Sequence, residues 1–231
     1  MSKKKLVVLS GAGISAESGL STFRDTGGLW AQYRIEDVAT PEAWRRNQKL
    51  VLDFYNQRRR EVMNAQPNAA HKALAELEDH FDVTVITQNI DDLHERGGSK
   101  KILHLHGEIM KSRSSADYQL LYECRGEIHV GDKCELGSQL RPHVVWFGEA
   151  VPMMDAAIEE TGQSEIFVVV GTSLQVYPAA GLLNYSPAGA KKFLVDPNKP
   201  DIMPVRNLEM ILEKASVGVP QLVRRLINDF K

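Results

Sequence analysis

Cysteine is scarce in this 231-residue sequence, no long apolar run occurs, and charge of neither sign is in excess. Two cysteines can form one disulfide at most, which excludes a disulfide-stapled secreted scaffold and favours a reduced, cytoplasmic setting. The apolar run at 6–9 is too short for a signal peptide, and no stretch is long enough to cross a membrane. With 28 basic against 30 acidic residues, the composition argues against binding to nucleic acid or to a membrane surface.

What the sequence does contain is an alternation of short β-branched runs with segments of helical periodicity. This alternation is typical of an α/β fold with a parallel sheet. One helix is expected over 68–80 with Asn68 as its N-cap, and another closes the sequence, where Pro220 is tolerated in a first turn. The predicted strands are 5–10, 82–87, 101–105, 166–170, 192–195 and 208–212.

Two stretches break this rhythm: 31–66 has helical character, and 108–143 is polar, irregular and contains both cysteines. We interpret both as insertions that form a smaller lobe within one domain. The predicted core is a Rossmann-like parallel sheet with helices on both faces. It comprises approximately 1–30, 67–107 and 146–231, and the small lobe comprises approximately 31–66 and 108–145.

A glycine-rich turn joins the first predicted strand to a helix, where dinucleotide-binding folds cradle a pyrophosphate. The letters GAGISA at 11–16 satisfy the pattern G-x-G-x-x-A, although glycines also occur in such turns for packing reasons. A dehydrogenase needs an acidic residue about 20 positions on, at the end of a second strand, and this chain has no such strand. A polar loop follows instead, in which Phe23 could contact nicotinamide or anchor the core, and Arg24 could contact phosphate.

Polar side chains follow two further predicted strands. Gln88, Asn89 and Asp91 follow the strand 82–87, and parallel sheets present ligands at the carboxyl ends of their strands. Their amide and carboxylate groups suit a carboxamide such as nicotinamide, although Asn89 or Asp91 could instead cap a helix at 92–96. The letters GTS at 171–173 follow another buried strand and suit phosphate or ribose.

A histidine at the end of a strand is a candidate general base. His104 and His106 alternate at the end of the strand 101–105, and Gly107 lets the chain turn directly after the second. We prefer His106 as the base, because His104 is also consistent with a hydrogen-bonded core histidine.

One arginine falls within the apolar stripe of the segment 50–63. The stripe consists of Val51, Phe54, Tyr55, Arg58 and Val62, at helical spacing. Desolvating an inward-facing cation is costly unless an anion meets it. Arg58 therefore predicts either an acidic ligand, shared with Tyr55, or an internal Asp or Glu partner. Arg59 and Arg60 fall on other faces and are expected to be solvated.

Taken in order, these motifs resemble the sirtuin family of NAD-dependent protein deacylases over nearly the whole chain. The resemblance is carried by GAGISAESGLSTFRD, TQNIDDLHERGG, LHLHGE, RPHVVWFGE and VVVGTSLQVYPAA. It implies that His106 is the catalytic base, and that Val145, Phe147 and Gly148 lie where an extended acyl-lysine peptide pairs. It also implies that NAD is held by Gly11, Ala12, Gly13, Ser15, Ala16, Glu17, Phe23, Arg24, Gln88, Asn89, Ile90, Asp91, Gly171, Thr172, Ser173, Asp196, Pro197, Asn198 and Ala215.

The reaction implied by the resemblance consumes NAD. The acyl-lysine amide oxygen attacks the ribose carbon as nicotinamide leaves, and His106 then acts as general base for a ribose hydroxyl. The implied products are free lysine, nicotinamide and O-acyl-ADP-ribose.

Two residues of the apolar stripe resemble a signature of one branch of the family. Tyr55 and Arg58 match the Tyr-x-x-Arg pair of the branch that removes succinyl and malonyl groups, and Ala39 fits that branch as well. A guanidinium can bind a carboxylate through two parallel hydrogen bonds. Acidic acyl groups are the expected substrates, with acetyl open as a further one.

The chain departs from the family at the structural zinc site, which two cysteine pairs form in most members. Here the letters KSRS at 111–114 stand at the first pair, and Gly137 replaces the partner of Cys134. A set made of both cysteines with His129 and His143 has spacings unlike those of known zinc sites. We therefore expect no zinc and a lobe held by packing.

Two other functions would use the same nucleotide site. An ADP-ribosyltransferase would pass ADP-ribose to a protein side chain, but it has no evident use for Tyr55 and Arg58. A non-catalytic sensor of NAD or ADP-ribose would not require His106, which is present.

Overall fold

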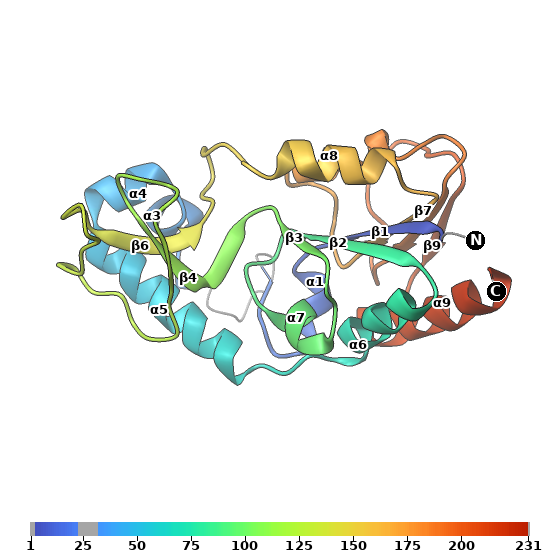
Figure 1. Cartoon of the computed structure of the whole chain (residues 1–231), viewed down its shortest axis with the longest axis horizontal. Helices are drawn as coiled ribbons and strands as arrows, with labels where there is room; N and C mark the ends of the chain where they lie inside the picture. The colour runs from blue at the N-terminus through green and yellow to red at the C-terminus, as the bar shows by residue number, and fades with distance from the viewer. Residues whose placement is uncertain (1–2, 23–31, 231) are drawn as a thin grey trace.

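The larger part of the protein is a six-stranded sheet in which every neighbouring pair of strands is parallel (Figure 1). The computed structural model describes residues 3–22 and 32–230. The strand order is β3-β2-β1-β7-β8-β9. The bounds are β1 (Lys5–Ser10), β2 (Asp82–Thr87), β3 (Ile102–His104), β7 (Ile166–Val170), β8 (Lys191–Val195) and β9 (Leu208–Ile211). Each predicted strand is confirmed to within one residue at either end.

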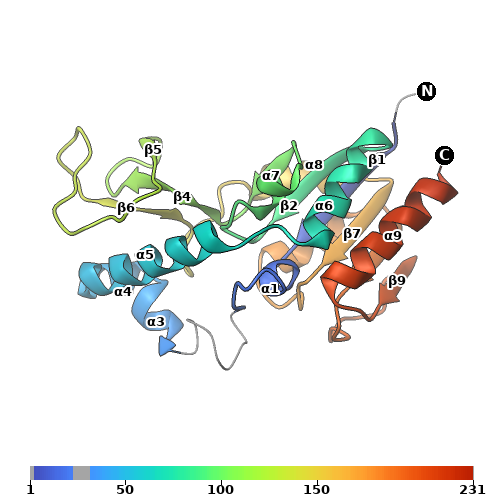
Figure 2. The ribbon, with the colours of Figure 1, turned by 90° about the horizontal axis from the view of Figure 1, so that it is seen from below.

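Helices cover both faces of this sheet, as predicted. Leu6 and Val8 of β1 face a cluster shared with one group of helices, whereas Val7 and Leu9 face the other group. Figure 2 shows two helices of the first group, α6 and α9, side by side. The first group is α1 (Gly13–Ala16), α6 (Ala69–Glu76), the 3-10 turn η1 (Leu77–Asp79) and α9 (Ala215–Asp229); the second is α8 (Met154–Gly162) and the 3-10 helix η2 (Ala179–Tyr185).

The capping of α6 is confirmed, and the position of Pro220 is corrected. The Asn68 side chain accepts a hydrogen bond from the amide of Ala70, as an N-cap residue does. Helix α9 begins at Ala215, so Pro220 lies in its second turn and not in its first. The added turn is capped from far away in the sequence, because the Glu17 carboxylate accepts hydrogen bonds from the Ser216 amide (2.9 Å) and hydroxyl (2.7 Å).

The smaller lobe, at the left of Figure 1, combines three helices with a three-stranded sheet. The helices α3 (Ile35–Val38), α4 (Pro41–Arg46) and α5 (Gln48–Asn64) confirm the helical character of the first insertion. The prediction that 108–143 is irregular was wrong, because β4 (Gly107–Ser114), β5 (Leu121–Glu123) and β6 (Leu140–Val144) form an antiparallel sheet. Ser112, Arg113 and Ser114 are buried although polar, which hides the alternation that marks a strand.

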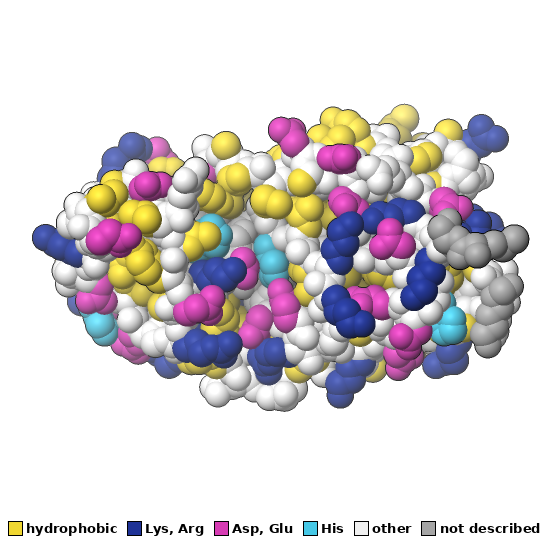
Figure 3. Space-filling view, viewed as in Figure 1, with side chains coloured by type: hydrophobic (Ala, Val, Ile, Leu, Met, Phe, Trp, Pro, Cys, Tyr) yellow, Lys and Arg dark blue, Asp and Glu magenta, His cyan; other side chains and the backbone are white. Residues whose placement is uncertain are grey.

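Charged side chains of both signs are interspersed on the face shown in Figure 3. Among residues 3–22 and 32–230, no helix has the length and apolarity that a membrane crossing requires. The short helix α7 (Leu93–Gly97) follows the carboxyl end of β2 and leads to the site.

Candidate active site

A cavity of about 1110 Å³ opens at the carboxyl ends of β1, β2, β7 and β8, between the large sheet and the small lobe. Phe23 and Arg24 lie outside the described residues. All the other residues predicted for the site line this one cavity: Gly11, Ala12, Gly13, Ser15, Ala16, Glu17, Tyr55, Arg58, Gln88, Asn89, Ile90, Asp91, His106, Val145, Phe147, Gly148, Gly171, Thr172, Ser173, Asp196, Pro197, Asn198 and Ala215.

The glycines of the first turn allow two strand ends to meet. A Cβ atom on Gly11 would lie 2.7 Å from the Cβ of Thr172, and one on Gly13 would lie 2.8 Å from the Cα of Gly171. The amide of Gly13 donates to the Gly171 carbonyl at 2.8 Å. Packing therefore requires glycine here, as the alternative interpretation held, and the same close approach leaves bare backbone on the cavity wall.

Asp91 connects the end of β2 to the glycine turn. The Ser15 hydroxyl donates to its Oδ2 at 3.0 Å, and the Leu93 amide donates to its Oδ1 at 3.1 Å. The residue therefore lines the cavity, and its carboxylate also accepts from the first amide of α7, as in an Asx-type helix start. Binding of a carboxamide by Asp91 stays a prediction. Burial raises the pKa of Asp91, while the bonds from Leu93 and Ser15 act in the opposite direction.

A buried histidine that sequence reasoning missed lies behind this network. The His71 ring lies 3.4 Å from the Ser15 hydroxyl, and its other nitrogen accepts from the Asn68 amide at 3.3 Å. Burial lowers the pKa of His71 to about 4, so the ring is neutral at physiological pH. Its position three residues after the N-cap Asn68, where a capping-box partner stands, is the signal that could have found it.

The ring of His106 has a defined tautomer. Its Nδ1 lies 2.9 Å from the carbonyl oxygen of Gln88, and since a carbonyl can only accept, Nδ1 carries the hydrogen. The lone pair is therefore on Nε2. Burial lowers the pKa of His106, which keeps the ring in the neutral form that a base requires.

His104 is engaged through both ring nitrogens, which supports the choice of His106. Nδ1 of His104 lies 3.3 Å from the Asn89 carbonyl, and Nε2 lies 2.7 Å from the Glu95 carboxylate. Burial disfavours the charged ring, but the bonds to Glu95 outweigh it and raise the pKa of His104. A ring held in this way belongs to the supporting structure of the site.

Helix α5 contributes a phenol and a guanidinium to the small-lobe side of the cavity. Tyr55 and Arg58 are 2% and 8% exposed, and Ala39 and Trp146 line the same region. Burial raises the pKa of Tyr55, so its hydroxyl stays protonated and can donate. The alternative that Arg58 pairs with an internal acid is observed, because its Nη1 lies 3.2 Å from the Glu61 carboxylate one helical turn away. Binding of an acidic ligand by Arg58 stays a prediction.

The guanidinium of Arg58 has a second anchor on the main chain. Its Nη2 donates to the Ser21 carbonyl at 3.1 Å. The side chain of Glu61 is one-third exposed, so the partner of Arg58 reaches solvent while the guanidinium itself is covered. Arg58 therefore combines burial, a fixed orientation and access to the cavity.

The prediction that Arg59 is solvated was wrong, whereas Arg60 behaves as expected. Arg59 is 1% exposed and Arg60, whose side chain is half-exposed, forms an ion pair with Glu127. Helical periodicity placed Arg59 off the apolar stripe correctly. The small-lobe sheet covers that face of α5 as well, which no pattern within the helix indicates.

The segment after β6 forms the wall opposite α5. The amide of Val145 donates to the His106 carbonyl at 2.9 Å, and the amide of Phe147 donates to the Ala39 carbonyl at 3.0 Å. Phe147 is 41% exposed, and Gly148 has a φ of +89° that favours glycine. Sequence reasoning missed Gln175, Tyr177, Lys199 and Lys214, which also line the cavity and follow the strand ends that it did identify.

The residues at the expected zinc positions do not supply a closed tetrahedral donor set. The thiol of Cys134 donates to the Ser114 hydroxyl at 3.3 Å, and that of Cys124 lies 3.6 Å from the Gly126 carbonyl. Within the described ranges, no group of three or more His, Cys, Asp or Glu side chains is placed to hold a metal ion. One cysteine among four expected thiolate positions does not fit a structural zinc ion.

Comparisons with known proteins agree on one family. Residues 11–178 match the model of the Sir2 family. A protein of Bacteroides thetaiotaomicron named NAD-dependent protein deacylase is 52% identical over 230 residues, covering 97% of this chain and 98% of that protein. A Helicobacter pylori protein with the same name is 50% identical over 225 residues, covering 97% and 98%.

Solved structures show the same similarity in three dimensions. The fold matches a Sir2 homologue in complex with NAD at a TM-score of 0.89 and 38% identity, covering 99% of this chain and 91% of that one. It also matches a Sir2 variant with a deacetylated p53 peptide and 3'-O-acetyl-ADP-ribose, at a TM-score of 0.82 and 29% identity, covering 98% and 94%.

Proposed function

Since the chain belongs to the Sir2 family, whose matched relatives are NAD-dependent protein deacylases, we propose that it removes acyl groups from protein lysines and prefers succinyl and malonyl over acetyl. We further propose that it belongs to the branch of that family that acts on acidic acyl groups. The observation that carries the preference is a buried guanidinium, Arg58, beside a buried phenol, Tyr55, on the wall of the cavity.

The physical argument for an acidic acyl group rests on desolvation. A charged group that is shielded from water is stabilised only by an opposite charge or by good hydrogen bonds. The planar guanidinium matches a carboxylate in a bidentate arrangement, and the protonated phenol of Tyr55 offers a further donor. An acetyl group has no carboxylate that could pair with Arg58. When an acetyl-lysine substrate is bound, Arg58 would therefore make no contact with the acyl group.

The remaining residues of the cavity suit the co-substrate. The glycine turn at 11–13 and the Gly171–Ser173 segment present bare backbone and small hydroxyl groups, which fit phosphate and ribose. Asn89 and Asp91 offer the amide and carboxylate groups that a carboxamide requires. NAD would supply the electrophilic ribose carbon, which the acyl-lysine amide oxygen attacks as nicotinamide leaves. His106 would then accept a proton at Nε2 from the ribose hydroxyl that attacks the resulting imidate carbon, and uptake of one water would release free lysine and O-acyl-ADP-ribose.

The direct test is mass spectrometry of succinyl-, malonyl- and acetyl-lysine peptides incubated with the purified protein, with and without NAD. We expect NAD-dependent loss of the acidic acyl groups that outpaces loss of acetyl. Loss of acetyl alone would overturn the preference while leaving the deacylase activity. ADP-ribosylated peptide, or NAD binding without any turnover, would favour the transferase or the sensor instead.

The pH dependence of the reaction should report His106. Because burial lowers its pKa below the ordinary 6.5, the ring is already neutral at pH 7, and activity should fall only as the pH drops through that lower pKa. We expect kcat/KM to be flat from pH 7 to 8 and to decrease about tenfold per pH unit well below the midpoint. Initial rates on succinyl peptide between pH 5 and 8.5 measure this, and a midpoint above 7 would contradict it.

The metal content of the protein should be below stoichiometric. We propose that packing and the Cys134–Ser114 contact do the work that zinc does in other family members. Elemental analysis of protein purified without chelator should therefore find far less than one zinc per chain, and dialysis against a chelator should leave the melting temperature unchanged. One equivalent of zinc, or a loss of stability on chelation, would show that the donor set has been misjudged.

A further inference from the structure

We infer that Asn56 and Arg59 are positioning residues that hold the acyl-binding side chains of α5 in a fixed relation to His106. This inference rests on the proposed function of Tyr55 and Arg58. Each of the two residues follows one of those side chains directly, so the pair lies about 100° around the helix from them. We call Asn56 and Arg59 the α5 clamp.

The guanidinium of Arg59 joins α5 to two segments of the small lobe. It is 1% exposed. Its Nε donates to the Ile109 carbonyl at 2.8 Å, and its Nη1 donates to the Gly126 carbonyl at 3.2 Å and to Asn56 Oδ1 at 2.9 Å. All three hydrogen-bond acceptors are neutral oxygens, so these bonds to the buried guanidinium are kept while the segments stay in place.

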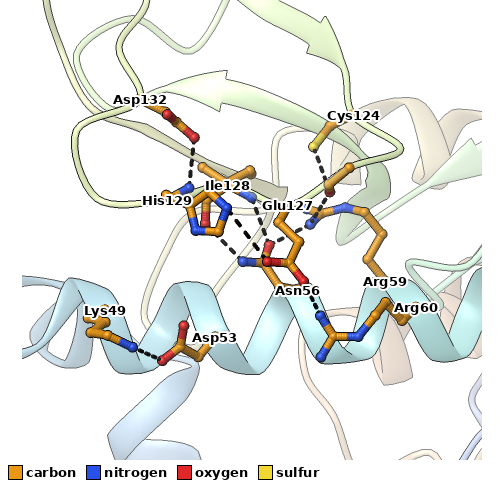
Figure 4. Close-up of polar contacts among 11 residues, drawn as sticks. Lys49, Asp53, Asn56, Arg59, Arg60, Cys124, Glu127, Ile128, His129 and Asp132 are labelled. Carbon is orange, nitrogen blue, oxygen red and sulfur yellow. Dashed lines mark hydrogen bonds and ion pairs between the residues drawn. The ribbon is translucent and has the colours of Figure 1, made fainter.

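The side-chain amide of Asn56 bonds to both main-chain groups of Ile128, in the way that a neighbouring strand residue would. Its Nδ2 donates to the Ile128 carbonyl at 2.9 Å, and its Oδ1 accepts from the Ile128 amide at 2.9 Å. Figure 4 shows both clamp side chains rising from α5 towards the loop that runs from Cys124 to Asp132. This lobe does not carry the four cysteines of a zinc site, and the clamp is a buried polar attachment of its loop to α5.

Ile109 extends the connection from the clamp to the catalytic side of the cavity. It belongs to β4, which begins at Gly107 directly after His106. Its carbonyl accepts from Arg59, and its amide donates to the Ile90 carbonyl at 2.8 Å. One residue therefore connects α5 both to the strand that follows His106 and to the loop that presents Asn89 and Asp91.

The geometry gives the clamp a selective effect on acidic acyl groups. Misplacement of a binding group by about 1 Å can cost up to about 100-fold in rate. A shift of α5 relative to β4 would move Arg58 away from the carboxylate of a bound succinyl-lysine, because the amide end of that substrate is held near His106. An acetyl group does not reach Arg58, so the same shift affects it less.

Arg60 is the matched control. It is an arginine on the same helix that contacts the same loop, through an ion pair with Glu127, but its side chain is half-exposed. An exposed pair of this kind contributes little. Arg60→Met therefore removes a guanidinium and one contact to the loop while leaving the α5 clamp intact.

The test compares Arg59→Lys, Asn56→Ser and Arg60→Met in the full-length protein. The first readout is amide hydrogen exchange at Ile109 and Ile128, and the second is the ratio of kcat/KM on succinyl peptide to that on acetyl peptide. We expect faster exchange and a ratio lowered about tenfold in both clamp variants, with Arg60→Met near wild type. Asn56→Ser keeps the test decisive if Arg59→Lys does not fold.

The outcomes separate the existence of the clamp, its positioning role and the proposed acyl preference. Unchanged exchange in the clamp variants would overturn the clamp itself. Faster exchange with an unchanged ratio would reduce it to a stabilising feature and overturn the positioning role. If the wild-type protein removes acetyl but not succinyl, the proposed preference fails and the positioning role with it, whereas the exchange data still decide whether the clamp exists.

Discussion

Replacing His106 with alanine should lower kcat for deacylation by about 10²- to 10⁴-fold, the contribution typical of a general base. The carbonyl of Gln88 fixes the hydrogen on Nδ1, so the substitution removes the Nε2 lone pair that accepts the proton. Succinyl and acetyl peptides should lose activity alike, because proton abstraction does not depend on the acyl chain. Steady-state rates on both peptides, followed by mass spectrometry, measure the effect.

His104→Gln is the control for this prediction. The two histidines are two residues apart, but His104 is held through both ring nitrogens by Asn89 and Glu95. Its replacement should reduce stability more than kcat, while His106→Ala should still bind NAD in a calorimetric titration. A His106→Ala protein that is folded, binds NAD and retains activity within about threefold of wild type would exclude the base assignment.

Replacing Arg58 with methionine should lower kcat/KM for succinyl peptide by about 30- to 1000-fold and leave that for acetyl peptide nearly unchanged. Loss of one partner from a buried, hydrogen-bonded charge pair costs about 2–4 kcal/mol, and about 1.4 kcal/mol corresponds to tenfold. Methionine keeps the length of the side chain and removes its charge. Competition between the two peptides in one tube, read by mass spectrometry, gives the ratio directly.

Two variants on α5 separate charge recognition from packing. Tyr55→Phe removes one hydrogen-bond donor and should cost less, about tenfold on succinyl peptide. Arg60→Met removes an exposed guanidinium from the same helix and should have little effect. Equal losses on succinyl and acetyl peptide in Arg58→Met would mean that the arginine supports the fold and does not select the acyl group.

The parts of the fold that follow from local pattern were predictable. The apolar runs of β1, β2 and β7 are long and continuous, as in strands buried on both faces, and their bounds match to the residue. Their carboxyl ends meet at one edge, which is why polar residues that follow different strands, from Ser15 to Ser173, could be assigned to a single cavity. Ala215 was implied by the resemblance to the sirtuin family alone.

The parts that depend on contacts between distant segments were not predictable. Two strands of the small lobe contain buried polar residues, such as Arg113 in β4 and Arg141 in β6, and the sequence therefore did not indicate them as strands. Arg59 lies off the apolar stripe of α5 and is buried because β4 and the loop near Gly126 cover that face of the helix. The first turn of α9 depends on Glu17, which is 199 residues away along the chain.

The ion pair between Arg58 and Glu61 has a consequence for how the pocket would exchange its contents. Glu61 supplies an internal carboxylate that occupies Arg58 in the structure. A succinyl group would therefore replace one carboxylate by another, and its affinity would be the difference between two similar interactions. In such a pocket the acyl carboxylate competes with the Glu61 carboxylate for Arg58. Glu61→Gln would weaken this internal competitor, so the variant protein would hold acidic products longer and release them more slowly.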